Sequence, residues 1–326
     1  MNAIDIEDVT KRYGDVQALD GLSLSVERGT TLGVFGTNGA GKTTLFKLLV
    51  GLNRPDDGTV RVAGLDPADG PAVRERVRYL PEHAGFPPNL TGREILRFHT
   101  RMRSVPAEKR AHHVERILHT IGLAEAADRP VSGYSNGMNR RLGLGTALVG
   151  DPSVLVLDEP TAGLDPEGIQ AFHDIVESLA AETEVTIVFS SHALSEIEQL
   201  CDEAVVVADG RVAMQGPVEV LRRATGDEVT VRLTLADADE AQAATATLRD
   251  EASAGSVSRT GPRLEVTCRP DSAYDLLTIV QQRHAVDRFE VREPGLEAAF
   301  HEAVGTASTT SGPDASPGDA AGGETA

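Results

Sequence analysis

Alternating apolar and polar residues predict short strands near the N-terminus. Apolar side chains recur at every second position in 4–6 and again in 22–26, the period of a strand with one buried face. A turn at Asp57-Gly58, followed by the alternating run Thr59 to Val62, predicts a hairpin. Between these segments, the apolar stretch TTLGVFG predicts a buried strand that leads into a glycine-rich loop and a helix from Lys42 to about Val50.

The middle of the chain, from about Pro87 to Leu142, has a helical pattern. Thr91 and Glu94 have the Thr-x-x-Glu spacing of a capping box and precede an apolar run. A second helix is predicted to carry one apolar face. That face consists of Val114, Ile117, Leu118 and Ile121.

Strands and helices alternate after Leu142. The segments SVLVLDEP, EVTIVFSS and EAVVVADG are short apolar runs rich in Val and Ile, and helical segments separate them. Parallel strands that are buried on both faces have this composition. Together with the glycine-rich loop, this alternation predicts a doubly wound α/β core.

A break at about Ala224 to Asp227 separates a second region. Beyond it, alternating strand and helix patterns predict a small α+β domain, which ends in the helical segment GLEAAFHEAVG. From Thr306 onward the chain has almost no apolar residues to bury, so we expect a disordered tail. The predicted division is 1–224, 225–304 and 305–326.

The chain is strongly acidic, with 50 acidic and 31 basic residues and a net charge of -19. Only four of the basic residues are lysines. Such a surface disfavours nucleic acid, whose binding needs basic patches. It also resembles the surface of proteins from a salt-loaded cytoplasm, because about 1 M salt shortens the Debye length to about 3 Å. We therefore expect a halophilic, haloarchaeal source, with an ordinary acidic cytosolic protein as the alternative.

No apolar run approaches the roughly 18 residues of a membrane-spanning helix. The first ten residues are acidic and lack the features of a secretory signal, so a cytoplasmic location is expected. Cys201 and Cys268 lie far apart without metal-ligand spacing. They are predicted to be small buried or half-buried apolar residues.

The segment 36–43, Gly-Thr-Asn-Gly-Ala-Gly-Lys-Thr, is a complete phosphate-loop motif. It follows an apolar strand and begins a helix, so its backbone N–H groups and the helix dipole favour phosphate oxygens. Lys42 would place its charge on the β- and γ-phosphates. The Thr43 hydroxyl would ligate Mg²⁺.

Two acids follow the buried strand Val154-Leu-Val-Leu. Asp158 and Glu159 lie at its carboxyl end, where α/β sheets bind ligands. Asp158 suits Mg²⁺ coordination through water. Glu159 is the candidate to orient the attacking water.

Further motifs occur in a fixed order along the chain. They are Lys11-Arg-Tyr13-Gly14, Tyr134-Ser135-Asn136-Gly137-Met138, Gly163-Leu164-Asp165-Pro166 and Phe189-Ser-Ser-His192. Over residues 1 to about 220 the chain resembles the nucleotide-binding domain of ABC transporters. In that resemblance, Tyr13 stacks on adenine, 134–138 is the signature motif, 163–166 is the D-loop and His192 is the switch histidine.

The resemblance implies an ATPase with a RecA-like core, an antiparallel β lobe and a helical subdomain. ATP and Mg²⁺ are the implied cofactors, and Glu159 and His192 the catalytic residues. Mg²⁺ would be held by Thr43, Glu82 and Asp158. The implied nucleotide-binding residues are Tyr13, Gly36, Asn38, Gly39, Gly41, Lys42, Thr43, Thr44, Ser135 and Gly137. Two such domains, from a homodimer or a pair of paralogues, would sandwich two ATP molecules head to tail and drive a separate membrane permease.

The motifs depart from the usual family pattern at three positions. Glu82 stands where the family usually has Gln, and it adds a negative charge near the triphosphate. Asn136 stands where Gly is usual, and Asn tolerates a left-handed backbone better than most residues. Met138 replaces a polar residue, and we have no physical account of that exchange.

The segments 79–102 and 133–166 resemble the ATPases that partner ABC-2-type permeases. Within that group they are most similar to the subunit that supports copper-site maturation of nitrous-oxide reductase. Direct metal binding is not expected, because the scattered middle-region residues fit solvated helix faces. These are His99, Met102, His112, His113 and His119.

The alternative function is a soluble ABC ATPase acting on ribosomes or DNA. The region 226–304 is expected either to help dimerisation passively or to regulate closure and recognise the permease.

Overall fold

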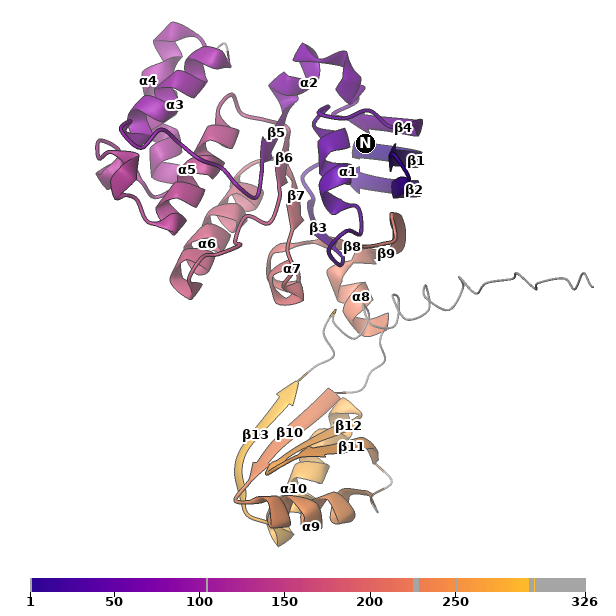
Figure 1. Ribbon diagram of the computed structural model, residues 1–326. Coiled ribbons are helices and arrows are strands. Elements are labelled where there is room, and N and C mark those ends of the chain that lie inside the picture. Colours follow the sequence, from indigo (N-terminus) through magenta and orange to yellow (C-terminus); the bar gives the residue numbers. More distant parts are fainter. Residues whose placement is uncertain are drawn as a thin grey trace, which may run out of the picture.

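The structure, a computed structural model, describes residues 2–103, 105–224, 229–249, 251, 253–292 and 296. These residues form three β-sheets with helices packed on them (Figure 1). The strands are β1 Asn2–Tyr13, β2 Val16–Glu27, β3 Thr31–Phe35, β4 Asp57–Val62, β5 Val77–Leu80, β6 Val154–Leu157, β7 Thr186–Ser190, β8 Glu203–Ala208, β9 Arg211–Pro217, β10 Val229–Leu235, β11 Ala254–Thr260, β12 Arg263–Cys268 and β13 Val286–Arg292. The α-helices are α1 Lys42–Leu49, α2 Pro71–Arg76, α3 Gly92–Met102, α4 Ala107–Thr120, α5 Asn136–Leu148, α6 Pro166–Glu182, α7 Leu194–Leu200, α8 Val218–Ala224, α9 Ala238–Arg249 and α10 Ala273–Arg283.

The central sheet has six strands in the order β5-β6-β7-β3-β8-β9. All neighbours are parallel except β8 and β9. Both faces are buried, because alternate residues of one strand enter different cores. On β6, Val154 and Val156 pack with α1 and the N-terminal strands, whereas Leu155 and Leu157 pack with α3 to α6. The predicted doubly wound α/β core is thus confirmed.

The N-terminal sheet is antiparallel, with the order β2-β1-β4. The predicted hairpin at Asp57-Gly58 is wrong, because both residues belong to β4, which pairs with β1. Gly58 has a φ of +83°, and a Cβ there would lie 2.5 Å from the Glu7 carbonyl oxygen. Glycine at this position therefore reflects the close approach of β4 to an irregular part of β1.

The middle region is helical, as predicted. Thr91 and Glu94 form the capping box that starts α3, and the predicted apolar face of α4 is buried. The expectation that the histidines here occupy solvated faces is wrong for His113. Its side chain is buried, and its Nε2 accepts a hydrogen bond of 3.1 Å from the Gly150 N–H.

The C-terminal sheet has the order β11-β12-β10-β13, all antiparallel. Its inward residues and helices α9 and α10 form a core of their own. Strand β11 was not expected, because AGSVSRT shows little apolar alternation. The predicted helix 295–305 lies outside the described residues except for Leu296, which is buried. The predicted disordered tail also lies outside them.

Two further predictions from the sequence concerned the burial of the cysteines and the absence of an apolar run long enough to span a membrane. Cys201 and Cys268 are both buried, as predicted. Within the described part of the chain, every helix is too short or too polar to cross a bilayer.

Candidate functional site

The phosphate loop connects β3 to α1 and is built around close backbone contacts. A Cβ on Gly36 would lie 2.3 Å from the Val207 carbonyl oxygen. Gly41 has a φ of +109°, and a Cβ there would lie 2.5 Å from the Ala18 carbonyl oxygen. Only glycine fits these two positions, so the loop can lie against β2 and β8 and lead into α1, and a helix start of this kind favours an anion. Asn38, Gly39 and Thr43 are exposed at this loop, and Thr44 is half-buried.

Lys42 lies inside the loop that it terminates. Its ammonium donates hydrogen bonds to the carbonyl oxygens of Gly36 at 2.7 Å and Thr37 at 3.4 Å. Burial lowers the pKa of Lys42, and the carboxylates of Glu159 and Asp158 oppose that shift. The positively charged Lys42 ammonium is therefore held inside the loop that would receive phosphate.

Asp158 is buried at the carboxyl end of β6 and is oriented from two sides. The Tyr79 hydroxyl donates to its Oδ2 at 2.8 Å, and the Ser190 hydroxyl donates to its Oδ1 at 3.1 Å. Burial, with help from the Asp158 charge, raises the pKa of Tyr79, so the phenol stays protonated and remains a donor. Tyr79 and Ser190 were not singled out from the sequence.

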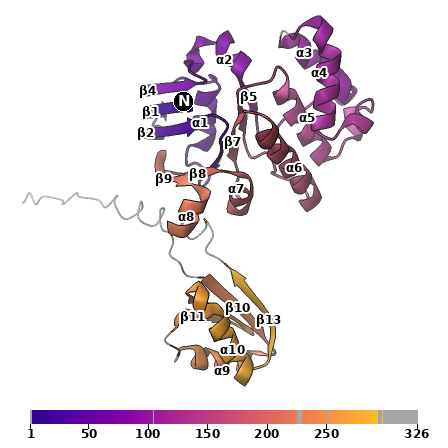
Figure 2. The ribbon, with the colours of Figure 1, turned by 180° about the vertical axis from the view of Figure 1, so that it is seen from behind.

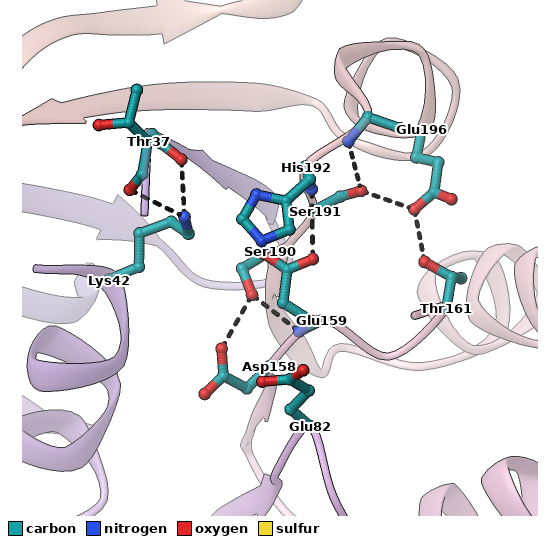
Figure 3. A network of polar contacts seen from close by, with 12 residues as sticks. Thr37, Lys42, Glu82, Asp158, Glu159, Thr161, Ser190, Ser191, His192 and Glu196 are labelled. Carbon is teal, nitrogen blue, oxygen red and sulfur yellow. Dashed lines mark hydrogen bonds and ion pairs between the residues drawn. The ribbon is translucent and has the colours of Figure 1, made fainter. Parts of the chain in front are cut away.

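Glu159 adjoins Asp158 in an unusual backbone conformation, with a φ of +43°. Its N–H donates to Ser190 Oγ at 2.9 Å, and its Oε2 accepts from the His192 N–H at 3.2 Å. His192 Nε2 lies 3.3 Å from Oε1, and Oε1 has no hydrogen-bond partner among the described residues. Burial raises the pKa of Glu159, while His192 and Lys42 oppose the shift. The structure thus brings Lys42, Asp158, Glu159 and His192 together (Figure 3).

A second polar group fixes the loop that carries His192. Glu196 on α7 accepts hydrogen bonds from the Thr161 hydroxyl at 2.7 Å and the Ser191 hydroxyl at 2.8 Å. Figure 3 shows this group beside Glu159. It ties the segment after β6 to the segment after β7, so the two catalytic candidates have a common support.

Arg140 on α5 holds two loops of the site together, the one after β5 and the one after β6, although sequence reasoning did not single it out. Its guanidinium is buried. Burial lowers its pKa to about 10, so it remains charged at neutral pH. It donates at 2.6 to 3.0 Å to the backbone carbonyl oxygens of Pro81, Glu82, Asp158, Glu159 and Pro160.

The signature residues lie at the start of α5. Ser135 is the N-cap, and its hydroxyl accepts from the Met138 N–H at 3.2 Å. Asn136 is the first residue of the helix and has no positive φ, so this position does not require the tolerance of Asn for a left-handed backbone. Helix α5 lies across β5–β7 from α1 (Figures 1 and 2), so the chain's own phosphate loop and its signature helix are on different sides of these strands.

Two candidates stand at the margin of the site. Tyr13 at the end of β1 is 46% exposed; its hydroxyl accepts a hydrogen bond from the Asn53 amide, and Lys11 Nζ lies 5.7 Å from its ring centroid. The Glu82 side chain is 52% exposed and lies beside Asp158 and Glu159 in Figure 3. Both side chains are accessible to a ligand.

Comparison with known proteins assigns this site to a family. Residues 19–162 match the family model described as ABC transporter. The daunorubicin resistance ATP-binding protein DrrA3 of Streptomyces coeruleorubidus is 41% identical over 76% of this chain and 78% of its own length. The Nod factor export ATP-binding protein I of Ralstonia nicotianae is 39% identical over 69% of this chain and 71% of its own length. The solved structure of cbiO1 from Clostridium perfringens, part of an ABC transporter complex, has a TM-score of 0.62 with 27% identity, over 69% of this chain and 94% of its own length.

A phosphate loop joined to a buried acidic pair on a doubly wound sheet defines a nucleotide-binding ATPase. With the similarities above, the chain belongs to the ATP-binding proteins of ABC transporters, and it is an ATPase coupled to transport.

Proposed function

We propose that this chain energises export of a small molecule through a separate ABC-2-type permease, at the inner face of the cell membrane. The observation that carries the proposal is the convergence of Lys42, Asp158, Glu159 and His192 at one loop (Figure 3). Names of similar proteins point in the same direction, since they refer to drug resistance, Nod factor export and bacitracin transport. They do not favour the alternative of a soluble ATPase acting on ribosomes or DNA.

Oxygen ligands for Mg²⁺ are available beside the phosphate loop. The Thr43 hydroxyl and the Asp158 carboxylate would hold the ion, with Glu82 as a further oxygen donor. This set fits the preference of Mg²⁺ for oxygen ligands and retained waters. Tyr79 and Ser190 hold the Asp158 carboxylate in one orientation. When bound, the ion neutralises charge on the phosphates.

Hydrolysis is assigned to Glu159 with help from His192. Burial keeps the carboxylate basic enough to accept a proton from a water molecule that it orients. The His192 backbone N–H holds Oε2, while Oε1 is buried and without a hydrogen bond in the described chain, so it would have a free lone pair for a water molecule that enters the site. His192 Nε2, 3.3 Å from Oε1, would stabilise the charge of the carboxylate.

A second nucleotide-binding domain would complete the site. Ser135 and Gly137 begin a helix that lies across β5–β7 from α1 (Figures 1 and 2), so a second copy or a paralogue would supply these groups to the phosphate loop. ATP would then be sandwiched head to tail, with Tyr13 against adenine. ATP binding would close the dimer, and hydrolysis would reopen it.

The remaining assignments concern the domains and the cargo. Residues 1–224 would form the nucleotide-binding domain, residues 225–304 an accessory domain and residues 305–326 a tail. The accessory domain would support dimerisation passively, or would regulate closure and recognise the permease. A copper-linked cargo rests on the sequence resemblance alone, since the similar proteins reported above are named for other transported molecules.

The proposal is tested by purifying the tagged chain from native membranes at high salt and identifying bound proteins by mass spectrometry. An untagged strain is the control. We expect a polytopic membrane protein in near-equal amount. A chain recovered without a membrane protein, or together with ribosomes, would contradict coupling to a separate permease.

A halophilic source would make the stability of the fold depend on salt. The net charge of -19 opposes compaction at low salt, and the Debye length falls from about 10 Å at 0.1 M to about 3 Å at 1 M. We expect the melting temperature followed by circular dichroism to rise over this range of KCl. Sucrose at matched osmolality controls for solute exclusion. A fold that melts at the same temperature throughout would count against the halophilic source.

A further inference from the structure

One face of the C-terminal sheet carries an ordered array of charges. On β10, Val231, Leu233 and Leu235 face the core with α9 and α10, so Thr230, Arg232 and Thr234 point to the other face. The strand register places residues of β12 and β13 opposite them. The resulting cross-strand rows are Thr267–Thr230–Arg292, Glu265–Arg232–Glu290 and Arg263–Thr234–Arg288.

Two of the four arginines on this face are matched by carboxylates. Arg232 bonds to Glu265 through Nε at 2.7 Å. Arg292 bonds to both oxygens of Glu290, at 3.0 and 3.3 Å. The pKa of Glu290 is lowered first by Arg292 and then by the charges of Arg232 and Arg288, so these guanidinium groups surround it.

The other two arginines have no such partner among the residues that the structure describes. Arg263 and Arg288 flank Thr234, both are exposed, and neither forms an ion pair within the described part of the chain. Their paired neighbours across the strands are Thr234 and Thr260, so no directly opposite carboxylate offsets either charge. A surplus of two positive charges on one face is also unexpected in a chain with a net charge of -19.

The same face is hollowed. A cavity of about 300 Å³ lies there, within the size range of small-ligand sites. Its lining contains all four arginines. The lining residues are Arg232, Thr234, Arg263, Arg288, Phe289, Glu290 and Arg292.

We propose that this hollow binds a phosphate-bearing ligand through Arg263 and Arg288, with the Thr234 hydroxyl between them. Guanidinium groups bind phosphate oxygens in a bidentate manner and stay charged at all relevant pH values. The surplus of two positive charges is enough to neutralise one phosphate group, which carries about -1.5 to -2 as a monoester at pH 7 and less as the diester of a lipid headgroup. The ligand is either a free phosphate compound or the headgroup of an anionic lipid, which share this chemistry. This site is separate from the phosphate loop of the central sheet.

Binding of pyrophosphate, measured by calorimetry, tests the site in the full chain. All proteins carry Lys42→Ala, so that the phosphate loop contributes little. Arg263→Gln with Arg288→Gln removes the unmatched charges. The control, Arg249→Gln with Arg283→Gln, removes two exposed charges from α9 and α10. Titrations use the lowest salt concentration at which the circular dichroism of every variant is unchanged.

We expect the dissociation constant for pyrophosphate to rise about tenfold or more in the Arg263/Arg288 variant and to stay constant in the control. Sedimentation with phosphatidylglycerol and phosphatidylcholine vesicles distinguishes the two ligand sources. Pyrophosphate binding that depends on Arg263 and Arg288 supports a free phosphate ligand. Binding only to phosphatidylglycerol vesicles, with the same dependence, supports a lipid headgroup. If neither probe distinguishes the variant from the control, the proposal is overturned.

Discussion

Replacing Glu159 by Gln is expected to slow ATP hydrolysis by about 10²- to 10⁴-fold, the usual contribution of a positioned general base. The amide keeps the shape of the side chain and can still accept from the His192 N–H, which now bonds Oε2 at 3.2 Å. It cannot accept a proton from water. ATP binding should therefore persist, and the ATP-bound dimer should accumulate.

Steady-state hydrolysis and size-exclusion chromatography with ATP check this expectation. Glu177→Gln, an exposed position on α6, is a matched control for loss of one negative charge. A Glu159→Gln protein that hydrolyses ATP at the rate of the parent would refute the catalytic assignment.

The pH dependence of the parent enzyme offers a second view of Glu159. Burial raises its pKa above the ordinary glutamate value, so kcat/KM should fall as pH decreases through that raised pKa. The His192 charge lowers the same pKa. His192→Ala should therefore move the acid limb of its residual activity to higher pH. An acid limb that does not move would contradict electrostatic contact between the two side chains.

Replacing Arg140 by Gln is expected to lower the free energy of unfolding by about 3 kcal/mol or more, because several buried carbonyl groups lose their donor. Five such carbonyl oxygens surround this buried guanidinium. Two of them belong to Asp158 and Glu159, so kcat should also decrease in the fraction that stays folded. Arg140→Lys should recover less than half of the lost stability, since an ammonium group cannot bond to all five carbonyl oxygens in the two loops.

Urea denaturation, together with hydrolysis measured at saturating ATP, separates the two effects. Arg141→Gln is the matched control. Arg141 is the neighbouring residue, and among the described residues it bonds only to the carbonyl oxygens of Ile121 and Gly122, away from Asp158. If the Arg140 and Arg141 variants lost equal stability and retained equal kcat, Arg140 would have no special role at the site.

Local sequence was sufficient for much of the fold. Apolar runs of Val and Ile identified β6, β7 and β8, and the Thr91–Glu94 spacing identified the start of α3. The partner with which each strand pairs was harder to predict from the sequence. Alternation shows that 59–62 is a strand, but it does not show that this strand pairs with β1 rather than with a neighbour in sequence.

The supporting residues of the site were harder to predict than its motifs. Tyr79 contacts Asp158 from 79 positions away, and Ser190 contacts it from 32. The local sequence around a polar residue at a strand end does not indicate such a distant contact. Arg140 follows the signature motif in a helix, where an arginine is usually a surface residue. Its burial depends on the two loops that fold over it.

The backbone of Glu159 has a consequence for protein engineering. A non-glycine residue with a φ of +43° costs of order 1 kcal/mol or more, and an incompletely bonded buried carboxylate adds to that cost. Substitutions at this position can therefore make the fold more resistant to heat while they remove turnover. A selection for thermostable variants that does not also require ATP hydrolysis will favour inactive protein here.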